Sequence, residues 1–257
     1  MQSRLWQLGC PPGARQGGKH VGSDTQAQDP APVALITGGS SGIGAATARL
    51  LLGRGHRVTV TGRDVGRLDR FAAELGRPAS LRTCPGDTAD FAAVRSAVEA
   101  TVKEFGRLDA VVASAGVSSF DNLADGDPAR WREMILTNVL GPALLVRAAL
   151  PALRETRGRF VLVGGIAGFS HSAGSLYGVT KWAQTALAEN TRLMAARDGV
   201  GVTLVAPGRV RTPFWDPVGP FPEGPALTAE EVAGSIVQAL DRPGNVDVGT
   251  VILRPAE

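Results

Sequence analysis

Short apolar runs alternate with amphipathic stretches along most of this 257-residue chain, and this alternation strongly limits the folds open to it. Seven runs have the length and composition of strands: residues 33–37, 57–61, 79–84, 109–113, 159–163, 200–206 and 249–253. Helical patterns cover residues 43–52, 65–75, 88–105, 128–154, 176–197 and 228–240. Near-continuous Val, Leu and Ile is typical of parallel strands covered on both faces. We therefore expect an α/β fold with one doubly wound domain, whose parallel seven-stranded sheet carries helices on both faces.

A glycine-rich segment joins the first apolar run to the first helical pattern. Residues 37–44 read TGGSSGIG, and glycines in such a turn let the backbone approach a phosphate closely. The helix that follows offers free N–H groups and positive partial charge at its start. Because the segment follows the first strand of a βαβ unit, it favours dinucleotide binding over a plain turn and makes the domain Rossmann-like. The candidate cofactor contacts are Thr37, Gly38, Ser40, Ser41, Gly42, Ile43 and Gly44.

Composition separates a leader from the domain and excludes several function classes. Residues 1–32 are rich in Gly, Pro and Gln without periodicity, so we interpret them as a disordered N-terminal leader before a domain at 33–257. A net charge of +3 with mixed signs gives no footprint for nucleic acid, and no apolar run approaches the roughly 20 residues of a membrane span. Two cysteines, Cys10 and Cys84, fit a reducing compartment, so a cytoplasmic location is expected. No metal-ligand spacing occurs among His, Cys, Asp and Glu.

Several motifs occur in the order in which one family carries them. They are the glycine turn, Asp87 after the third strand, Asn138 in LTNV, Tyr177 and Lys181 in YGVTK, and Pro207 and Gly208 after the sixth strand. Together they resemble the classical short-chain dehydrogenase/reductase family, from about Val33 to the C-terminus. The resemblance implies a nicotinamide cofactor and hydride exchange between a small-molecule carbonyl or alcohol and that cofactor. It also implies that Asp87 and Thr88 border the adenine, and that Pro207, Gly208, Val210 and Thr212 contact the nicotinamide carboxamide; cap and turn roles remain alternatives for these residues.

The end of the second strand indicates which cofactor is used. An acid there bonds the ribose 2′-hydroxyl, whereas an arginine accommodates a 2′-phosphate. Arg63 comes first after Gly62, and its planar fork suits a phosphate. Asp64 follows and either reaches the ribose or caps the next helix. We favour NADP(H) over NAD(H).

Tyr177 and Lys181 are four residues apart, so they share one face of a helix. A neighbouring ammonium stabilises a phenolate and lowers the pKa of the tyrosine toward useful acid–base work. We expect Tyr177 to donate the proton in carbonyl reduction and Lys181 to tune it and bind the ribose. The resemblance implies that Asn138 holds a water in the proton path.

The chain departs from the family pattern at its catalytic serine. Aligned through residues 167–168, the serine position is Gly165, whereas a thirteen-residue count back from Tyr177 gives Gly164. A glycine has no hydroxyl for the substrate carbonyl, and Ser114 also stands where the family usually has asparagine. The nearby candidates to replace the hydroxyl are Ser170, His171 and Ser172, with Ser175 interpreted as a helix cap. A bound water or the substrate itself is the other alternative.

Two interpretations of function follow from these matches and departures. The first is an NADP(H)-dependent oxidoreductase; the alternative is a cofactor-binding sensor or scaffold with impaired catalysis. In the proline-rich segment 212–227, Phe214, Trp215 and Phe221 are candidates for an apolar pocket wall under a flap. Apolar residues on the helices expected at 128–154 and 176–197 indicate a subunit interface, and the family resemblance implies a homodimer or homotetramer.

Overall fold

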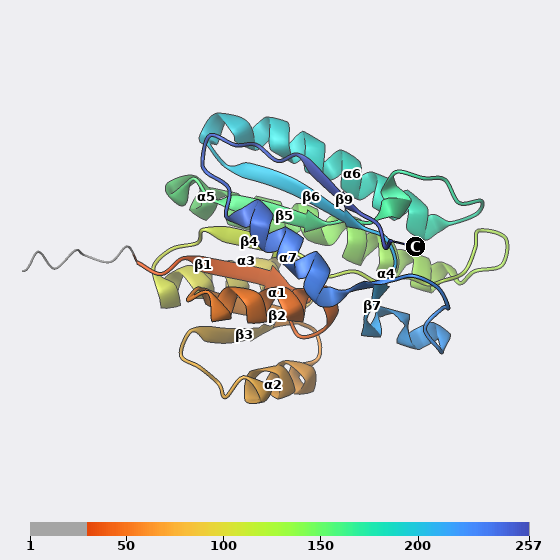
Figure 1. The fold of residues 1–257 in the computed structure, drawn as a ribbon, viewed down its shortest axis with the longest axis horizontal. Helices are drawn as coiled ribbons and strands as arrows, with labels where there is room; N and C mark the ends of the chain where they lie inside the picture. Colours follow the sequence, from red (N-terminus) through yellow and green to blue (C-terminus); the bar gives the residue numbers. More distant parts are fainter. Residues whose placement is uncertain (1–29, 257) are drawn as a thin grey trace, which may run out of the picture. The chain divides into compact units, whose positions relative to one another are not determined.

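Seven parallel strands form the central sheet, in the order β3-β2-β1-β4-β5-β6-β9 (Figure 1). The structure is a computed structural model that describes residues 30–256. The strands are β1 (Val33–Thr37), β2 (Arg57–Gly62), β3 (Leu81–Pro85), β4 (Ala110–Ala113), β5 (Arg159–Val163), β6 (Gly201–Pro207) and β9 (Thr250–Leu253). The short strands β7 (Val210–Arg211) and β8 (Leu227–Thr228) pair separately. The predicted sheet is confirmed in strand number and direction.

Helices cover both faces of the sheet, as the near-continuous apolar strands require. Helices α1 (Gly42–Gly53), α2 (Val65–Glu74) and α7 (Ala229–Leu240) pack on one face, where Ala34 and Ile36 of β1 point. Helices α3 (Phe91–Phe105), α5 (Gly141–Thr156) and α6 (Leu176–Ala195) pack on the other, where Val33 and Leu35 point. The chain crosses from β3 to β4 on the far side of β1. The carboxyl ends of β1 and β4 therefore form the switch point at which such sheets bind ligands.

Two helices differ from the sequence prediction. The helix expected from residue 88 begins at Phe91, because the Asp90 side chain accepts a hydrogen bond from the Ala92 N–H and caps it. The helix expected at 128–154 is divided into α4 (Pro128–Ile135), a π-helical turn (Leu136–Leu140) and α5. In a regular helix the Asn138 carbonyl would accept from residue 142, but that residue is proline and has no N–H. The π turn carries Asn138 into the core.

The continuous helical run Pro128–Thr156 is, within residues 30–256, the one helix long and apolar enough to cross a membrane by length and composition. Its side chains Leu145, Ala149 and Leu153 are buried in the core against the sheet, as in the core helix of a folded domain.

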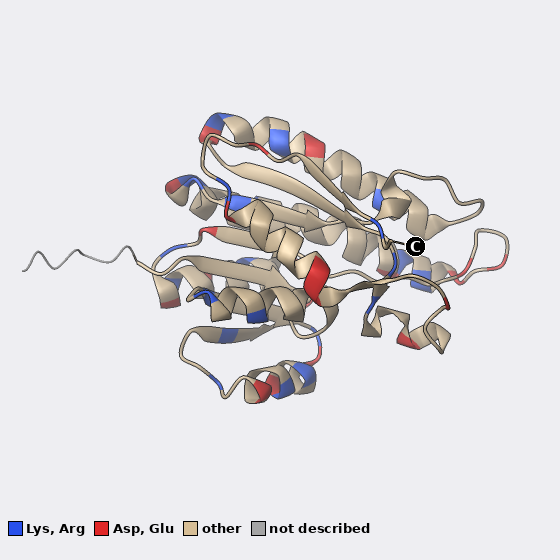
Figure 2. Cartoon of the chain, in the orientation of Figure 1, with Lys and Arg blue, Asp and Glu red and all other residues tan. Residues whose placement is uncertain are grey.

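Acidic and basic side chains are interspersed over the helices (Figure 2). The leader predicted at 1–32 lies outside the described residues except for its last three.

Candidate active site

A cavity of about 440 Å³ opens at the carboxyl ends of β1, β4, β5 and β6. Ten of the predicted site residues line it: Gly38, Ser41, Gly42, Ile43, Tyr177, Lys181, Pro207, Gly208, Val210 and Thr212. The others do not line it. Thr37, Asp87 and Thr88 border a small separate space at the end of β3. Ser40, Gly44 and Arg63 lie outside the lining, and Asn138 is fully buried.

The glycine turn has the geometry that its sequence predicts. Gly38 has φ +65°, a conformation that side chains with a Cβ rarely adopt. A Cβ on Gly44 would collide with the Gly38 carbonyl, so only glycine lets the turn close on α1. Ser41, the N-cap of α1, makes no side-chain cap hydrogen bond. The first N–H groups of α1 therefore remain available for an anionic group.

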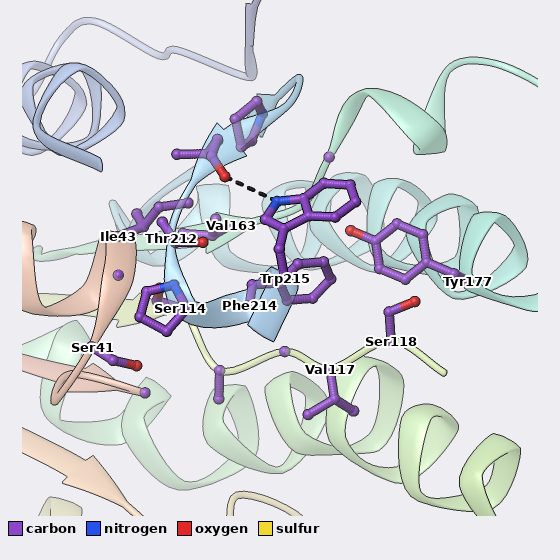
Figure 3. A pocket seen from close by; sticks show the side chains of 18 of the residues that line it. Ser41, Ile43, Ser114, Val117, Ser118, Val163, Tyr177, Thr212, Phe214 and Trp215 are labelled. Atoms are coloured by element: carbon purple, nitrogen blue, oxygen red, sulfur yellow. Dashed lines mark hydrogen bonds between the residues drawn. The ribbon is translucent and has the colours of Figure 1, made fainter. Parts of the chain in front are cut away.

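Tyr177 and Lys181 project from the first turns of α6. The helix begins there because the Ser175 hydroxyl accepts a hydrogen bond from the Gly178 N–H at 3.0 Å, as the cap interpretation predicted. The Lys181 Nζ lies 5.3 Å from the centre of the Tyr177 ring. In Figure 3 the Tyr177 hydroxyl points into the cavity toward Trp215.

Burial shifts the pKa values of both groups in the ligand-free protein. It raises the pKa of Tyr177 and lowers the pKa of Lys181 to about 8, because it disfavours each charged form. The predicted lowering of the Tyr177 pKa by Lys181 is therefore outweighed by burial. Tyr177 remains protonated at neutral pH, which is the form that a proton donor requires.

Asn138 is held by hydrogen bonds at its side-chain amide and at its backbone carbonyl. Its Nδ2 donates to the Val117 carbonyl at 2.9 Å and to the Thr180 hydroxyl at 3.1 Å, and its Oδ1 accepts from the Val117 N–H. Its backbone carbonyl accepts from the Gln184 Nε2 at 2.8 Å. Sequence reasoning missed Gln184, which stands three residues after Lys181 and is 1% exposed.

The structure resolves which glycine occupies the serine position. A Cβ on Gly165 would lie 3.7 Å from the Tyr177 Oη and 3.6 Å from the Lys181 side chain, both ordinary contacts. A Cβ on Gly164 would instead press against Leu204 at 2.8 Å. Gly165 therefore faces the tyrosine, in agreement with the alignment through residues 167–168.

The candidate replacements for the missing serine hydroxyl, which follow Gly165 in the chain, do not line the cavity. Ser170 donates to the Ile166 carbonyl, His171 stacks on Trp182, and Ser172 does not line the cavity. The hydroxyls that do line it after β4 belong to Ser114, Ser118 and Ser119. The sequence analysis considered only the segment next to Gly165 and therefore missed the loop after β4.

Of these hydroxyls, Ser119 donates to the Asp121 carboxylate. The Ser118 oxygen accepts from the Phe120 N–H at 3.1 Å, which leaves its own proton for another acceptor. Ser118 and Tyr177 both line the cavity (Figure 3).

Charged side chains gather on the side of the cavity near α2. Arg63 donates to the Glu133 carboxylate at 2.6 Å, and both side chains are about half exposed. Glu133, Arg67 and Arg130 line the cavity. Asp64 accepts from the Arg67 N–H at 2.9 Å, which caps α2 and lowers the pKa of Asp64. The cap interpretation of Asp64 is confirmed, and Arg67 is a cavity cation that the sequence analysis did not name.

Aromatic side chains form one wall of the cavity beside Tyr177. Phe214 lies 5.9 Å from the Tyr177 ring and 5.2 Å from Phe120, centre to centre. Phe214 and Trp215 line the cavity, whereas Phe221 packs on Trp215 from outside the lining. The Trp215 Nε1 donates to the Val210 carbonyl at 3.0 Å (Figure 3), which fixes the indole on the short strand β7. Two of the three predicted aromatic residues therefore form the wall.

A doubly wound sheet with a glycine turn and a tyrosine–lysine pair at one cavity defines a nicotinamide-dependent oxidoreductase. Residues 32–222 match the family model described as short chain dehydrogenase. An uncharacterised oxidoreductase of Staphylococcus epidermidis is 34% identical over 225 residues, which are 87% of this chain and 96% of that protein. The chain belongs to the short-chain dehydrogenase/reductase family.

Solved structures agree with this assignment. ElxO with NADP bound has a TM-score of 0.79 and 29% identity, and the match covers 88% of this chain and 97% of that one. The alcohol dehydrogenase of the archaeon Thermococcus sibiricus, complexed with 5-hydroxy-NADP, has a TM-score of 0.79 and 30% identity over the same shares of the two chains.

Proposed function

We propose that this protein reduces a moderately apolar ketone or aldehyde, or oxidises the matching alcohol, with NADP(H) as the cofactor. The observation that carries the proposal is that Tyr177 and Lys181 line the same cavity as the glycine turn at Gly38–Ile43. A bound nicotinamide supplies the hydride to the carbonyl carbon. Tyr177 donates the proton to the carbonyl oxygen, Lys181 binds the ribose, and Phe214 and Trp215 shield an apolar substrate from water.

The first test is NADPH consumption against a panel of ketones, aldehydes and quinones. We expect turnover of at least one apolar carbonyl compound. A wild-type protein that binds NADPH but turns over no compound would favour the alternative, a cofactor-binding sensor with impaired catalysis. Gly165 supports that alternative, because no hydroxyl stands at the serine position.

The preference for NADP(H) is supported by the cations near α2. Arg63 and Arg67 offer guanidinium groups, and the Asp64 Oδ1 is engaged as the cap of α2. Replacing Arg63 by alanine should weaken NADPH binding about tenfold and NADH binding much less, because a charge-assisted bond to the 2′-phosphate is lost. Cofactor fluorescence titration measures both affinities.

Two variants sharpen this prediction. Glu133→Gln removes the carboxylate that holds Arg63 and should strengthen NADPH binding. Arg70→Ala, on the same helix as Arg67 but outside the cavity lining, should change neither affinity. Equal losses of NADPH and NADH binding in Arg63→Ala would refute the cofactor assignment.

We also propose that the protein is a homodimer or homotetramer in the cytoplasm. Large apolar side chains are exposed on α6 and the π turn, including Val179 at 56%, Leu193 at 59% and Leu140 at 39%. Contiguous exposed apolar patches mark interaction surfaces, and these side chains are the candidates for one. Gel filtration with light scattering should give at least twice the chain mass, and Leu193→Glu should shift the protein toward the monomer. A wild-type monomer at micromolar concentration would refute this proposal.

A further inference from the structure

A buried amide joins two of the site residues. The Lys181 Nζ donates to the Gln184 Oε1 at 2.9 Å, and the Gln184 Nε2 donates to the Asn138 backbone carbonyl at 2.8 Å. All three residues are buried, with exposures of 5%, 1% and 0%. Both ends of the Gln184 amide are therefore used inside the core, and the bridge runs from the base of the cavity to the π turn.

The local sequence explains why a glutamine suits this position. The regular helical donor to the Asn138 carbonyl is missing because Pro142 has no N–H, and the Gln184 amide supplies a donor to this buried oxygen. Lys181, on the other side, has an ammonium that can only donate. Only a side chain with a donor and an acceptor at one end satisfies both groups, and a primary amide has them.

We propose that Gln184 is a positioning residue that ties the Lys181 ammonium to the Asn138 carbonyl and thereby fixes the place and the charge of the lysine beside Tyr177. The family resemblance implies that Asn138 holds a water, and the Gln184 amide occupies the backbone carbonyl of that residue. The Gln184 amide holds the Lys181 ammonium in place but does not relay a proton. The consequence for catalysis rests on the proposed function, whereas the bridge itself does not.

The charge of Lys181 depends on few other groups. Within residues 30–256, the titratable side chain that faces the Lys181 ammonium is Tyr177, which lies on the same helix. The segments packed around it from β5, the loop after β4 and the π turn contribute Gly165, Gly116 and Asn138, none of which titrates. Burial disfavours the ammonium and lowers its pKa. The Gln184 oxygen accepts a hydrogen bond from this ammonium, and an acceptor favours the charged form of its donor.

The test is a titration of Lys181 by NMR on the intact protein with ¹³C-labelled lysine. The chain has only three lysines, Lys19, Lys103 and Lys181, so the signals are few and Lys103→Arg helps to assign them. Gln184→Met removes the acceptor at similar volume and should lower the titration midpoint of Lys181 by about one pH unit. Gln184→Glu replaces the acceptor by a carboxylate and should raise the midpoint.

Thr191→Val is the matched control, because Thr191 is a buried polar residue two turns further along the same face of α6. It should leave the Lys181 midpoint unchanged, while thermal unfolding reports the stability of every variant. Opposite shifts in the two Gln184 variants support the proposal, since a merely structural glutamine would alter stability without them. Midpoints within about 0.3 pH units of the wild type in both variants, or shifts in the same direction, would overturn it.

The titration needs neither cofactor nor substrate, so its outcome is separate from that of the proposed function. A protein that bound neither NADPH nor NADH would refute the proposed function and leave the Gln184 result standing. Conversely, turnover by the wild type together with an unchanged Lys181 midpoint in both Gln184 variants would support the proposed enzyme. It would also show that Gln184 does not set the charge of Lys181.

Discussion

Replacing Tyr177 by phenylalanine is expected to lower kcat by about 10²- to 10⁴-fold, the range that a positioned proton donor contributes. The variant removes one hydroxyl and keeps the ring that contacts Phe214 at 5.9 Å and Lys181 at 5.3 Å. The fold and cofactor affinity should therefore change little. Steady-state kinetics on the best carbonyl substrate, together with NADPH titration, separate the two effects. Tyr177 is the only tyrosine in the chain, so no other phenol replaces it.

Lys181→Met provides the comparison for this prediction. It should weaken NADPH binding as well as kcat, because the lysine is proposed to bind the ribose, whereas Tyr177→Phe should reduce kcat alone. Retention of more than about a tenth of the wild-type kcat by Tyr177→Phe would contradict the assigned role of the phenol. Loss of NADPH binding in that variant, which keeps the ring, would indicate that the hydroxyl itself contributes to cofactor binding.

The sheet was predictable because each of its strands is a short apolar run between turn residues. Val33, Leu35, Ala34 and Ile36 face opposite helical layers, so both faces must be apolar and the run is continuous. Local signals also predicted the caps at Asp64 and Ser175, since such a residue acts on backbone groups only three positions away.

The parts of the site that depend on distant segments were not predictable in this way. Gln184 meets Asn138 across 46 positions, and Arg63 meets Glu133 across 70. A weak signal existed for Gln184, because it lies on the same helical face as Tyr177 and Lys181 at spacings of seven and three residues. The search for a substitute hydroxyl near Gly165 failed for the same reason, since Ser118 enters the cavity from the loop after β4.

Replacing Gly165 by serine should raise kcat/KM about tenfold or more, because one donor to a developing oxyanion is worth about 10²–10³ in rate in other enzymes. The backbone accepts the change: Gly165 has φ 175°, an extended conformation open to any residue. The new Cβ would lie 3.7 Å from the Tyr177 Oη without a clash. The added hydroxyl would therefore enter the cavity beside the proposed proton donor. Kinetics of both proteins on the same substrate panel measure the gain.

Gly164→Ser is the matched control, since it makes the same chemical change one residue earlier. Its Cβ would press on Leu204, so it should lower the melting temperature and bring no gain in rate. A silent wild type beside an active Gly165→Ser variant would establish the sensor interpretation, with a site disabled by a single missing hydroxyl. An active wild type that gains nothing from the serine would instead show that the substrate carbonyl already has its second donor, and Ser118, whose proton is free, would be the group to replace by alanine next.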